Sequence, residues 1–300
     1  MEDLKVFKHI YHDVFLKIYD NTFYVFLCGG AGRDCIRNIV RKNLELDGVQ
    51  VFYPEDLFMD MLNRNKKANL LEFENLLADS ADAIIIICES IGAAAELGAF
   101  VQMKDLTSKI IICVEKKYVR NKSFIMDGPV KYLITKTGDK SKHFIDYDKK
   151  NLLSTCNSIK RVIKTRRYSI NSLLSFIKKD PDFNLIPTYI PLIQSIIYFY
   201  QTINRKVLFS TLKQLLIDEE KCPSRYNELF NATIKYLLKQ GLLTVEAKAN
   251  VGFSYNEQMI KLSEKGIKNV EKFLDTSSIS SKNILCDKIR CAILKEQLNS

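Results

Sequence analysis

Several residue types and motifs are scarce or missing in this chain of 300 residues, and their absence excludes whole classes of protein. With 11 Gly and 6 Pro, the chain is neither collagenous nor of low complexity. Its eight cysteines include no Cys-x-x-Cys pair, which indicates reduced, structural thiols. The first residues, MEDLKVF, are acidic and lack the apolar stretch of a signal peptide, so we expect a cytoplasmic protein.

Common cofactor and metal motifs are also missing. There is no GxxxxGK[ST] loop, and GGAGRD does not match GxGxxG, which argues against a P-loop ATPase and an ordinary dinucleotide dehydrogenase. His9 and His12 would share a helical face, but no third ligand can be identified. Cys286 and Cys291 have no histidine nearby in sequence. We therefore expect no metal site and no resident cofactor.

One long stretch, residues 183–204, carries no charge and is long enough to cross a bilayer. It contains Pro187, Pro191 and several Gln, Asn, Thr and Ser residues, which favour a buried helix with a proline-marked start over a membrane span.

The distribution of charge along the chain differs between its halves. Residues 1–150 hold 22 basic and 22 acidic residues, whereas residues 151–300 hold 23 basic and 13 acidic residues. A neutral half followed by a basic half predicts a small-molecule site followed by a surface for a polyanion. The alternative is a basic domain whose charge serves only solubility.

In the first half, apolar runs typical of strands alternate with helical patterns. The runs cover residues 22–28, 49–54, 82–88 and 109–115, with a weaker one at 143–147. This alternation predicts an α/β fold with a doubly wound, Rossmann-like parallel sheet, in which ligands bind beyond the carboxyl ends of the strands.

Candidate substrate-binding residues come directly after three of these strands: Gly29, Gly30, Tyr53, Glu55, Asp56, Ser90 and Gly92. The glycines would let a ligand approach the backbone, or they only make a tight turn. The acidic pair at 55 and 56 would shape the pocket, or it only begins a helix.

Glu96 is the strongest catalytic candidate. It lies four residues beyond Gly92, in an Ala-rich helix that leaves the most apolar strand. A carboxylate there could attack an anomeric carbon or stabilise an oxocarbenium ion, as cleavage of a glycosidic bond requires. The alternative is a glutamate that the helix dipole favours near the helix start.

The motifs FLCGG, FYPEDLF and ESIGAAAELGAF, with a Glu in the helix before DAIIII, resemble the nucleoside 2-deoxyribosyltransferase superfamily. More closely, they resemble the ribosyltransferase-like, DNA-binding effectors encoded beside retron reverse transcriptases in antiphage systems. The resemblance implies that Glu96 is the catalytic glutamate and that Glu74 stands where the transferases carry an aspartate that handles the leaving base. It also implies cleavage of an N-glycosidic bond in a nucleotide, with NAD as the expected substrate.

At two positions, Glu74 and Ser90, the sequence departs from the transferases, which carry an aspartate at each. Ser90 stands where they carry a sugar-binding aspartate, which removes a charged partner for sugar hydroxyls and argues against base exchange between deoxynucleosides. A nucleophilic or charge-stabilising carboxylate such as Glu96 works in its ionised form, whereas a general acid must be held protonated. Of the two glutamates, Glu74 is the better candidate for the general acid.

The second half carries mainly helical patterns. A helix over 207–220, a second one beginning near Ser224, a two-stranded wing and a last helix over 264–274 predict a winged helix-turn-helix. Such domains bind nucleic acid, and they also serve as plain interaction modules. The candidate nucleic-acid contacts lie on or before the second helix: Arg225, Asn227, Asn231, Lys235 and Lys239.

These patterns predict four regions: a nucleoside deoxyribosyltransferase-like domain (1–148), a helical connector (149–204), the winged helix-turn-helix (205–275) and a helical tail (276–300). By the resemblance, we expect a toxic retron effector whose partners are the reverse transcriptase and its branched RNA–DNA product, in a higher-order assembly. The alternatives are a DNA-binding regulator with a nucleotide-sensing domain and a metabolic deoxyribosyltransferase.

Overall fold

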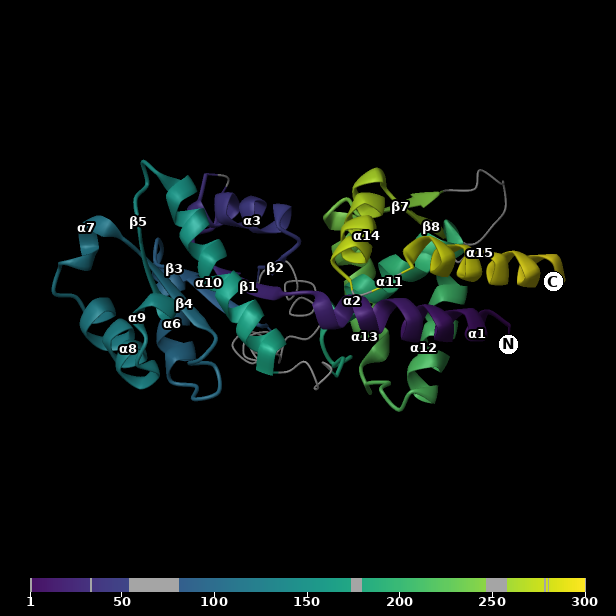
Figure 1. Ribbon diagram of the computed structural model, residues 1–300, viewed down its shortest axis with the longest axis horizontal. Coiled ribbons are helices and arrows are strands. Elements are labelled where there is room, and N and C mark those ends of the chain that lie inside the picture. Colours follow the sequence, from purple (N-terminus) through teal and green to yellow (C-terminus); the bar gives the residue numbers. More distant parts are fainter. Residues whose placement is uncertain are drawn as a thin grey trace. The chain divides into compact units, whose positions relative to one another are not determined.

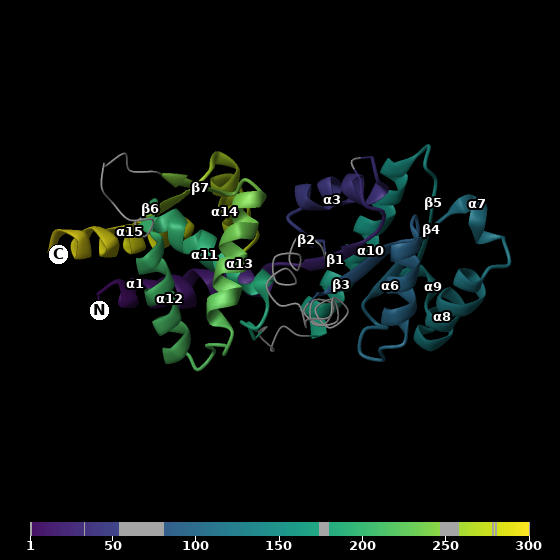
Figure 2. The same ribbon diagram turned by 180° about the vertical axis from the view of Figure 1, so that it is seen from behind.

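The computed structural model describes residues 2–32, 34–53, 81–173, 180–246, 258–277, 279 and 281–299. It divides into two compact units (Figures 1 and 2). Residues 23–178 form what we call the α/β unit, and residues 1–22 with 179–300 form the helical unit. The sequence-based boundaries differ from this division, since they placed residues 1–22 in the first domain and kept 149–204 together as a connector.

The described part of the α/β unit contains five strands and the helices that cover them. Its described elements are β1 (Tyr24–Cys28), α3 (Ile36–Leu46), β2 (Gln50–Phe52), β3 (Ala83–Ile87), α6 (Ile91–Val101), β4 (Ile110–Glu115), α7 (Lys116–Val119), the π-helical turn η2 (Met126–Val130), α8 (Lys131–Thr137), α9 (Lys140–His143), β5 (Phe144–Tyr147) and α10 (Leu152–Leu173).

The five strands form one parallel sheet in the order β2-β1-β3-β4-β5. The α/β class and the parallel sheet expected from the sequence are confirmed. β3, with the sequence AIIII, is buried along its whole length, as expected of a central strand covered on both faces. Because β2 and β3 lie on opposite sides of β1, the strand order reverses between β1 and β3, where open α/β sheets bind ligands.

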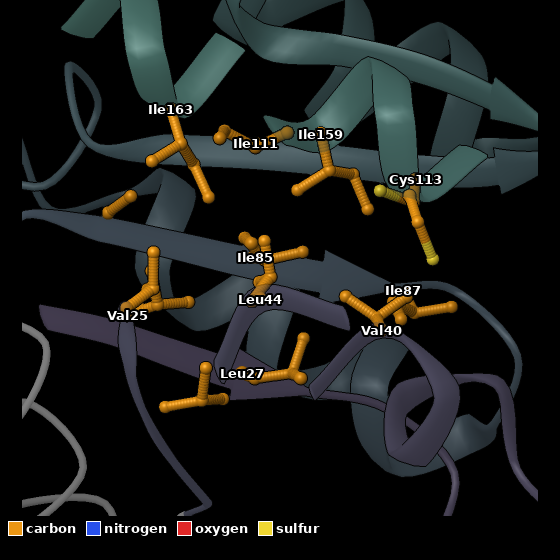
Figure 3. Packing of buried hydrophobic residues seen from close by; sticks show 14 of the residues in the cluster. Val25, Leu27, Val40, Leu44, Ile85, Ile87, Ile111, Cys113, Ile159 and Ile163 are labelled. Carbon is orange, nitrogen blue, oxygen red and sulfur yellow. The ribbon is translucent and has the colours of Figure 1, made fainter. Parts of the chain in front are cut away.

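Apolar side chains from α3 and α10 cover one face of this sheet. The period of two along each strand sends alternate residues to that face. Figure 3 shows the resulting layer, formed by Val25, Leu27, Ile85, Ile87, Ile111 and Cys113 from the strands and Val40, Leu44, Ile159 and Ile163 from the two helices. On α6, Leu97 and Phe100 are fully buried, and the Phe100 ring centroid lies 5.9 Å from that of Phe26. Buried side chains from α3, α10 and α6 therefore pack against the strands that lead to the carboxyl ends of the sheet.

In the helical unit, other helices pack around one buried helix, α11 (Ile186–Tyr200). Its described elements are α1 (Glu2–His9), the π-helix η1 (Ile10–Phe15), α2 (Leu16–Asn21), α11 (Ile186–Tyr200), β6 (Thr202–Asn204), α12 (Arg205–Asp218), α13 (Tyr226–Lys239), β7 (Leu243–Glu246), β8 (Met259–Leu262), α14 (Glu264–Thr276) and α15 (Lys282–Asn299). α11 is buried along nearly its whole length and begins with Pro187, which confirms the predicted buried helix with a proline-marked start. In the described part of the chain, no helix is long and apolar enough to cross a bilayer.

A small antiparallel sheet, with strand order β6-β8-β7, accompanies α12 and α13. The predicted pair of helices followed by two strands is therefore present, and β6 is an additional strand that the sequence pattern did not predict. The tip of the predicted wing, residues 247–257, lies outside the described residues.

Charge is distributed differently over the units than over the sequence halves. The α/β unit holds 25 basic and 18 acidic residues, and the helical unit holds 20 and 17. The contrast between a neutral and a basic half therefore does not carry over to the units. The reason is that residues 151–178, with six basic and no acidic residues, belong to the α/β unit.

Candidate functional site

The carboxyl ends of β1 and β3 are neighbours, and Glu89, a residue that the sequence patterns did not single out, links the loops beyond them. Glu89 Oε1 accepts a hydrogen bond from the Gly30 amide at 3.0 Å, and its Oε2 accepts one from the Ile36 amide at 3.2 Å. Ile36 is the first residue of α3. A carboxylate from the end of β3 thus fixes the loop after β1 and the start of α3.

This carboxylate explains the two glycines. A Cβ atom at Gly30 would lie 3.2 Å from Glu89 Cγ and Cδ, and one at Gly29 would lie 3.1 Å from Arg37 Cβ. Larger residues would therefore disturb Glu89 and Arg37. Amides at a helix start are the kind that bind phosphate elsewhere, but here Glu89 accepts from the first amide of α3, at Ile36, and from the Gly30 amide in the loop before it.

The ring of Tyr53, directly after β2, packs against the guanidinium groups of two arginines of α3. The guanidinium carbons of Arg37 and Arg41 lie 4.4 and 4.6 Å from the centroid of the Tyr53 ring. The Tyr53 hydroxyl donates to Asn38 Oδ1 at 2.8 Å, and burial raises the pKa of this phenol to about 12. Tyr53 therefore stays neutral and is held in place. The sequence analysis did not identify Arg37 as a site residue, although it is only 6% exposed in the structure. The position of an arginine within a helical pattern does not reveal whether its side chain is buried.

Ser90 begins the helix that carries Glu96. Its Oγ accepts a hydrogen bond from the Ala93 amide at 3.2 Å and caps α6. The bond occupies a lone pair of the hydroxyl, whose proton can still be donated. A Cβ atom at Gly92 would meet only Ser90 Oγ, at 3.9 Å, so packing does not require glycine there.

Glu96 lies in the second turn of α6, in register with the buried residues Ala93 and Phe100. Its side chain is partly buried, and its Oε2 atom is shielded from solvent. α6 comes after β3 and packs against it, so this carboxylate is carried by the helix that begins at the β1/β3 switch point. The other acidic candidates, Glu55, Asp56 and Glu74, lie outside the described residues.

The ends of β4 and β5 add a carboxylate and a phenol. Glu115 pairs with Lys117 at 3.1 Å and with Lys149 at 3.5 Å. Tyr147 is 1% exposed, and burial, with the nearby carboxylates of Glu89 and Glu115, raises the pKa of its hydroxyl above the usual range. This hydroxyl therefore stays protonated.

On α13, two of the candidate nucleic-acid contacts are engaged within the unit. Asn231 Oδ1 accepts from Arg205 Nη2 at 2.7 Å, and its Nδ2 donates to the Asn227 carbonyl at 2.7 Å. Arg225 pairs with Glu228 at 2.6 Å. These bonds use part of the hydrogen-bonding capacity of Asn231 and Arg225 and hold both side chains in place.

The remaining candidates on α13 are accessible. Asn227, Lys235 and Lys239 are exposed and lie at multiples of four residues from one another, so they line the solvent side of the helix. The opposite side is buried, with Leu229, Phe230, Thr233, Ile234 and Leu237 among its residues.

The two histidines considered for a metal site each pair with one carboxylate. His9 Nδ1 lies 3.3 Å from Asp13 Oδ2, and His12 Nε2 lies 2.9 Å from Glu219 Oε1. Within the described residues, no group of three or more His, Cys, Asp or Glu residues is arranged to hold a metal ion.

Comparisons with known proteins place this architecture in a family. Two relatives from Escherichia coli are named "Retron Ec86 putative ribosyltransferase/DNA-binding protein" and "Retron Ec73 putative ribosyltransferase/DNA-binding protein". The first is 41% identical over 112 residues, which cover 36% of each chain. The second is 36% identical over 132 residues, 41% of this chain and 42% of the relative. The matched stretches thus span less than half the length of either relative.

A broader match comes from the family described as STM3845 retron effector protein, which covers residues 30–245. This span includes Glu89, Glu96 and the helices α12 and α13, so it extends over both units. The chain belongs to the STM3845 retron effector protein family.

Proposed function

We propose that this effector cleaves the N-glycosidic bond of a nucleotide, with NAD as substrate and Glu96 as the catalytic carboxylate. The observation that carries the proposal is the position of Glu96, a partly buried carboxylate on the helix that leaves β3 at the β1/β3 switch point. The names of the two retron relatives support glycosyl transfer, and the ELG motif supports a deoxyribosyltransferase-like active site.

In the proposed reaction, the bond between C1′ of the ribose and the ring nitrogen of nicotinamide breaks, and its electron pair goes to that nitrogen. The positive charge left on C1′ and the ring oxygen is stabilised by the ionised carboxylate of Glu96, through space or through a transient ester bond. Water then adds to C1′ and loses a proton, which yields ADP-ribose and nicotinamide.

The chemistry of the leaving group favours NAD over a deoxynucleoside. The nicotinamide ring of NAD is cationic before cleavage and leaves as a neutral molecule, so no acid needs to protonate it. A purine or pyrimidine would leave as an anion unless a general acid protonated it. Ser90 in place of a sugar-binding aspartate also weighs against a deoxynucleoside substrate, and its helix cap leaves an O–H group able to donate to a hydroxyl.

The test is nicotinamide release by the purified protein, together with NAD levels in cells that express it alone. Glu96→Gln keeps the size of the side chain and removes its charge, so we expect NAD cleavage to fall by at least about a hundredfold. Glu271→Gln is the matched control, because Glu271 is an exposed glutamate on α14 of the helical unit, outside the strand-end site. NAD loss that is equal in the wild type and in Glu96→Gln would contradict the proposal.

Membership of a retron effector family suggests a second measurement, in which the effector is expressed together with its proposed partner. Effector activity must be restrained until a trigger arrives, which requires a partner that binds the inhibited and active states differently. We propose the reverse transcriptase with its branched RNA–DNA product as that partner. Co-expression of both should preserve the NAD pool, whereas intact NAD in cells with the effector alone would exclude constitutive cleavage.

We also infer that β6, α12, α13, β7 and β8 form a winged helix-turn-helix that binds nucleic acid. The order of the elements, the antiparallel sheet and the exposed row Asn227, Lys235 and Lys239 support this inference. The names of the relatives include DNA binding. In such domains the second helix enters the major groove and the wing contacts backbone phosphates.

A binding measurement over a range of salt concentrations tests this inference. For a 20-base-pair duplex, Lys235→Gln with Lys239→Gln should weaken binding and lower the slope of log K against log salt by about two, since two phosphate contacts are lost. The control is Lys268→Gln with Lys288→Gln, which removes the same charge from exposed positions on α14 and α15. An equal loss in both variants would show that only net charge matters, and that α13 does not contact the duplex.

A further inference from the structure

A second basic region lies in the α/β unit, on the segment that follows β4. Residues 116–142 contain eight basic and two acidic residues, although the first 150 residues together are neutral. Within this segment, α7, α8 and α9 lie on the β4–β5 side of the sheet (Figures 1 and 2). The turn η2, between α7 and α8, contacts α6, the helix that carries Glu96. This segment therefore carries a net charge of 8−2 = +6.

These elements enclose an open pocket of about 300 Å³. Four cationic side chains line it, Arg120, Lys122, Lys131 and Lys140, against one carboxylate, Asp127. Its volume is at the lower end of the range of small-ligand sites. The described residues that line it include none from the strand-end site.

Three of these cations have no ion-pair partner among the described residues: Arg120, Lys122 and Lys131. Two neighbouring lysines outside the pocket are paired. Lys117 pairs with Glu115 at 3.1 Å, and Lys142 pairs with Asp139 at 3.2 Å. Among the described residues, these three cations are therefore not held in ion pairs, and Asp127 is the one carboxylate that lines the pocket with them.

The other residues that line the pocket are four apolar ones together with Asn121 and Thr135, and an unusual turn shapes it. Val119, Met126, Val130 and Ile134 contribute its hydrophobic surface. η2 takes a π-helical form and contains Pro129, which lacks the amide proton of a regular turn. Phe124, 83% exposed, packs close to Gly128 on the same turn. A ligand here would meet cations, apolar side chains and a nearby exposed aromatic ring.

We propose that this pocket binds a phosphate group of a nucleotide. The planar guanidinium of Arg120 can donate two hydrogen bonds to phosphate oxygens, and Lys122 and Lys131 supply point charges. The apolar residues and Phe124 suit the base or sugar attached to the phosphate. A free nucleotide and a nucleotide within a single strand present the same chemistry, so the experiment distinguishes these two sources.

The test titrates the full chain with ADP and, separately, with a 12-nucleotide oligothymidylate that lacks terminal phosphates. The pocket variant combines Arg120→Gln and Lys122→Gln. The matched control combines Lys104→Gln and Lys150→Gln, which removes the same charge from exposed positions outside the pocket. We expect the pocket variant to bind at least about tenfold more weakly than the control, as loss of charged hydrogen bonds predicts.

Glu96→Gln separates this pocket from the proposed active site. Binding to the pocket should survive Glu96→Gln and should weaken as salt is raised. Tighter binding of ADP would identify a free nucleotide as the ligand, and tighter binding of the oligothymidylate would identify a strand. The proposal is overturned if the wild type binds neither probe, or if the pocket and control variants bind equally.

Discussion

At the scale of single residues, Glu89 decides how the strand-end site is built. Its two oxygens accept from the Gly30 and Ile36 amides, so a carboxylate of the protein occupies the start of α3. An amide side chain offers one acceptor instead of two and carries no charge. Glu89→Gln should therefore leave one of these amides without a good partner and destabilise the loop by about 1 to 2 kcal/mol.

Hydrogen exchange of peptides that cover residues 29–37 measures this effect directly. Exchange in Glu89→Gln should be faster there than in the wild type and unchanged in β4. Glu271→Gln serves again as the comparison, because its exposed side chain lies on α14, outside the α/β unit. Protection of the loop that is the same in both variants would mean that Glu89 does not hold it.

At the scale of secondary-structure elements, local patterns predicted the strands and helices well and their tertiary partners poorly. The runs DAIIIIC and KIIICVE are buried strands because continuous apolar residues suit only a sheet covered on both faces. The fate of polar side chains depends on neighbours distant in sequence. Asn231, expected to read bases, is held by Arg205, which is 26 residues away.

The basic cluster on α10 illustrates the same limit. Arg166 donates to the carbonyls of Lys109 and Lys142, both at 2.7 Å, and so ties α10 to the segments that precede β4 and β5. Burial lowers the pKa of its guanidinium to about 10, and the group stays charged at neutral pH. From sequence, this arginine is indistinguishable from an exposed one that attracts phosphate.

At the scale of the whole molecule, the division into two units changes which unit carries the net positive charge and which unit includes the N-terminal residues. Most of the net positive charge falls in the α/β unit, where the sequence halves suggested neutrality. The first 22 residues, in turn, belong with residues 179–300. Phe7, Tyr11, Phe15 and Ile18 are each at most 1% exposed, so the N-terminal helices supply part of the core of the helical unit.

This arrangement predicts how fragments of the chain will fold. Each large buried apolar side chain contributes about 1.5 to 3 kcal/mol, so loss of these four would consume most of a typical stability of about 5 to 15 kcal/mol. Residues 179–300 alone should therefore lack a cooperative thermal transition, and joining residues 1–22 through a flexible linker should restore it. Residues 23–178 contain their whole sheet and should unfold cooperatively alone. Equal melting temperatures for 179–300 with and without residues 1–22 would show that the N-terminal helices only cover a core that is already complete.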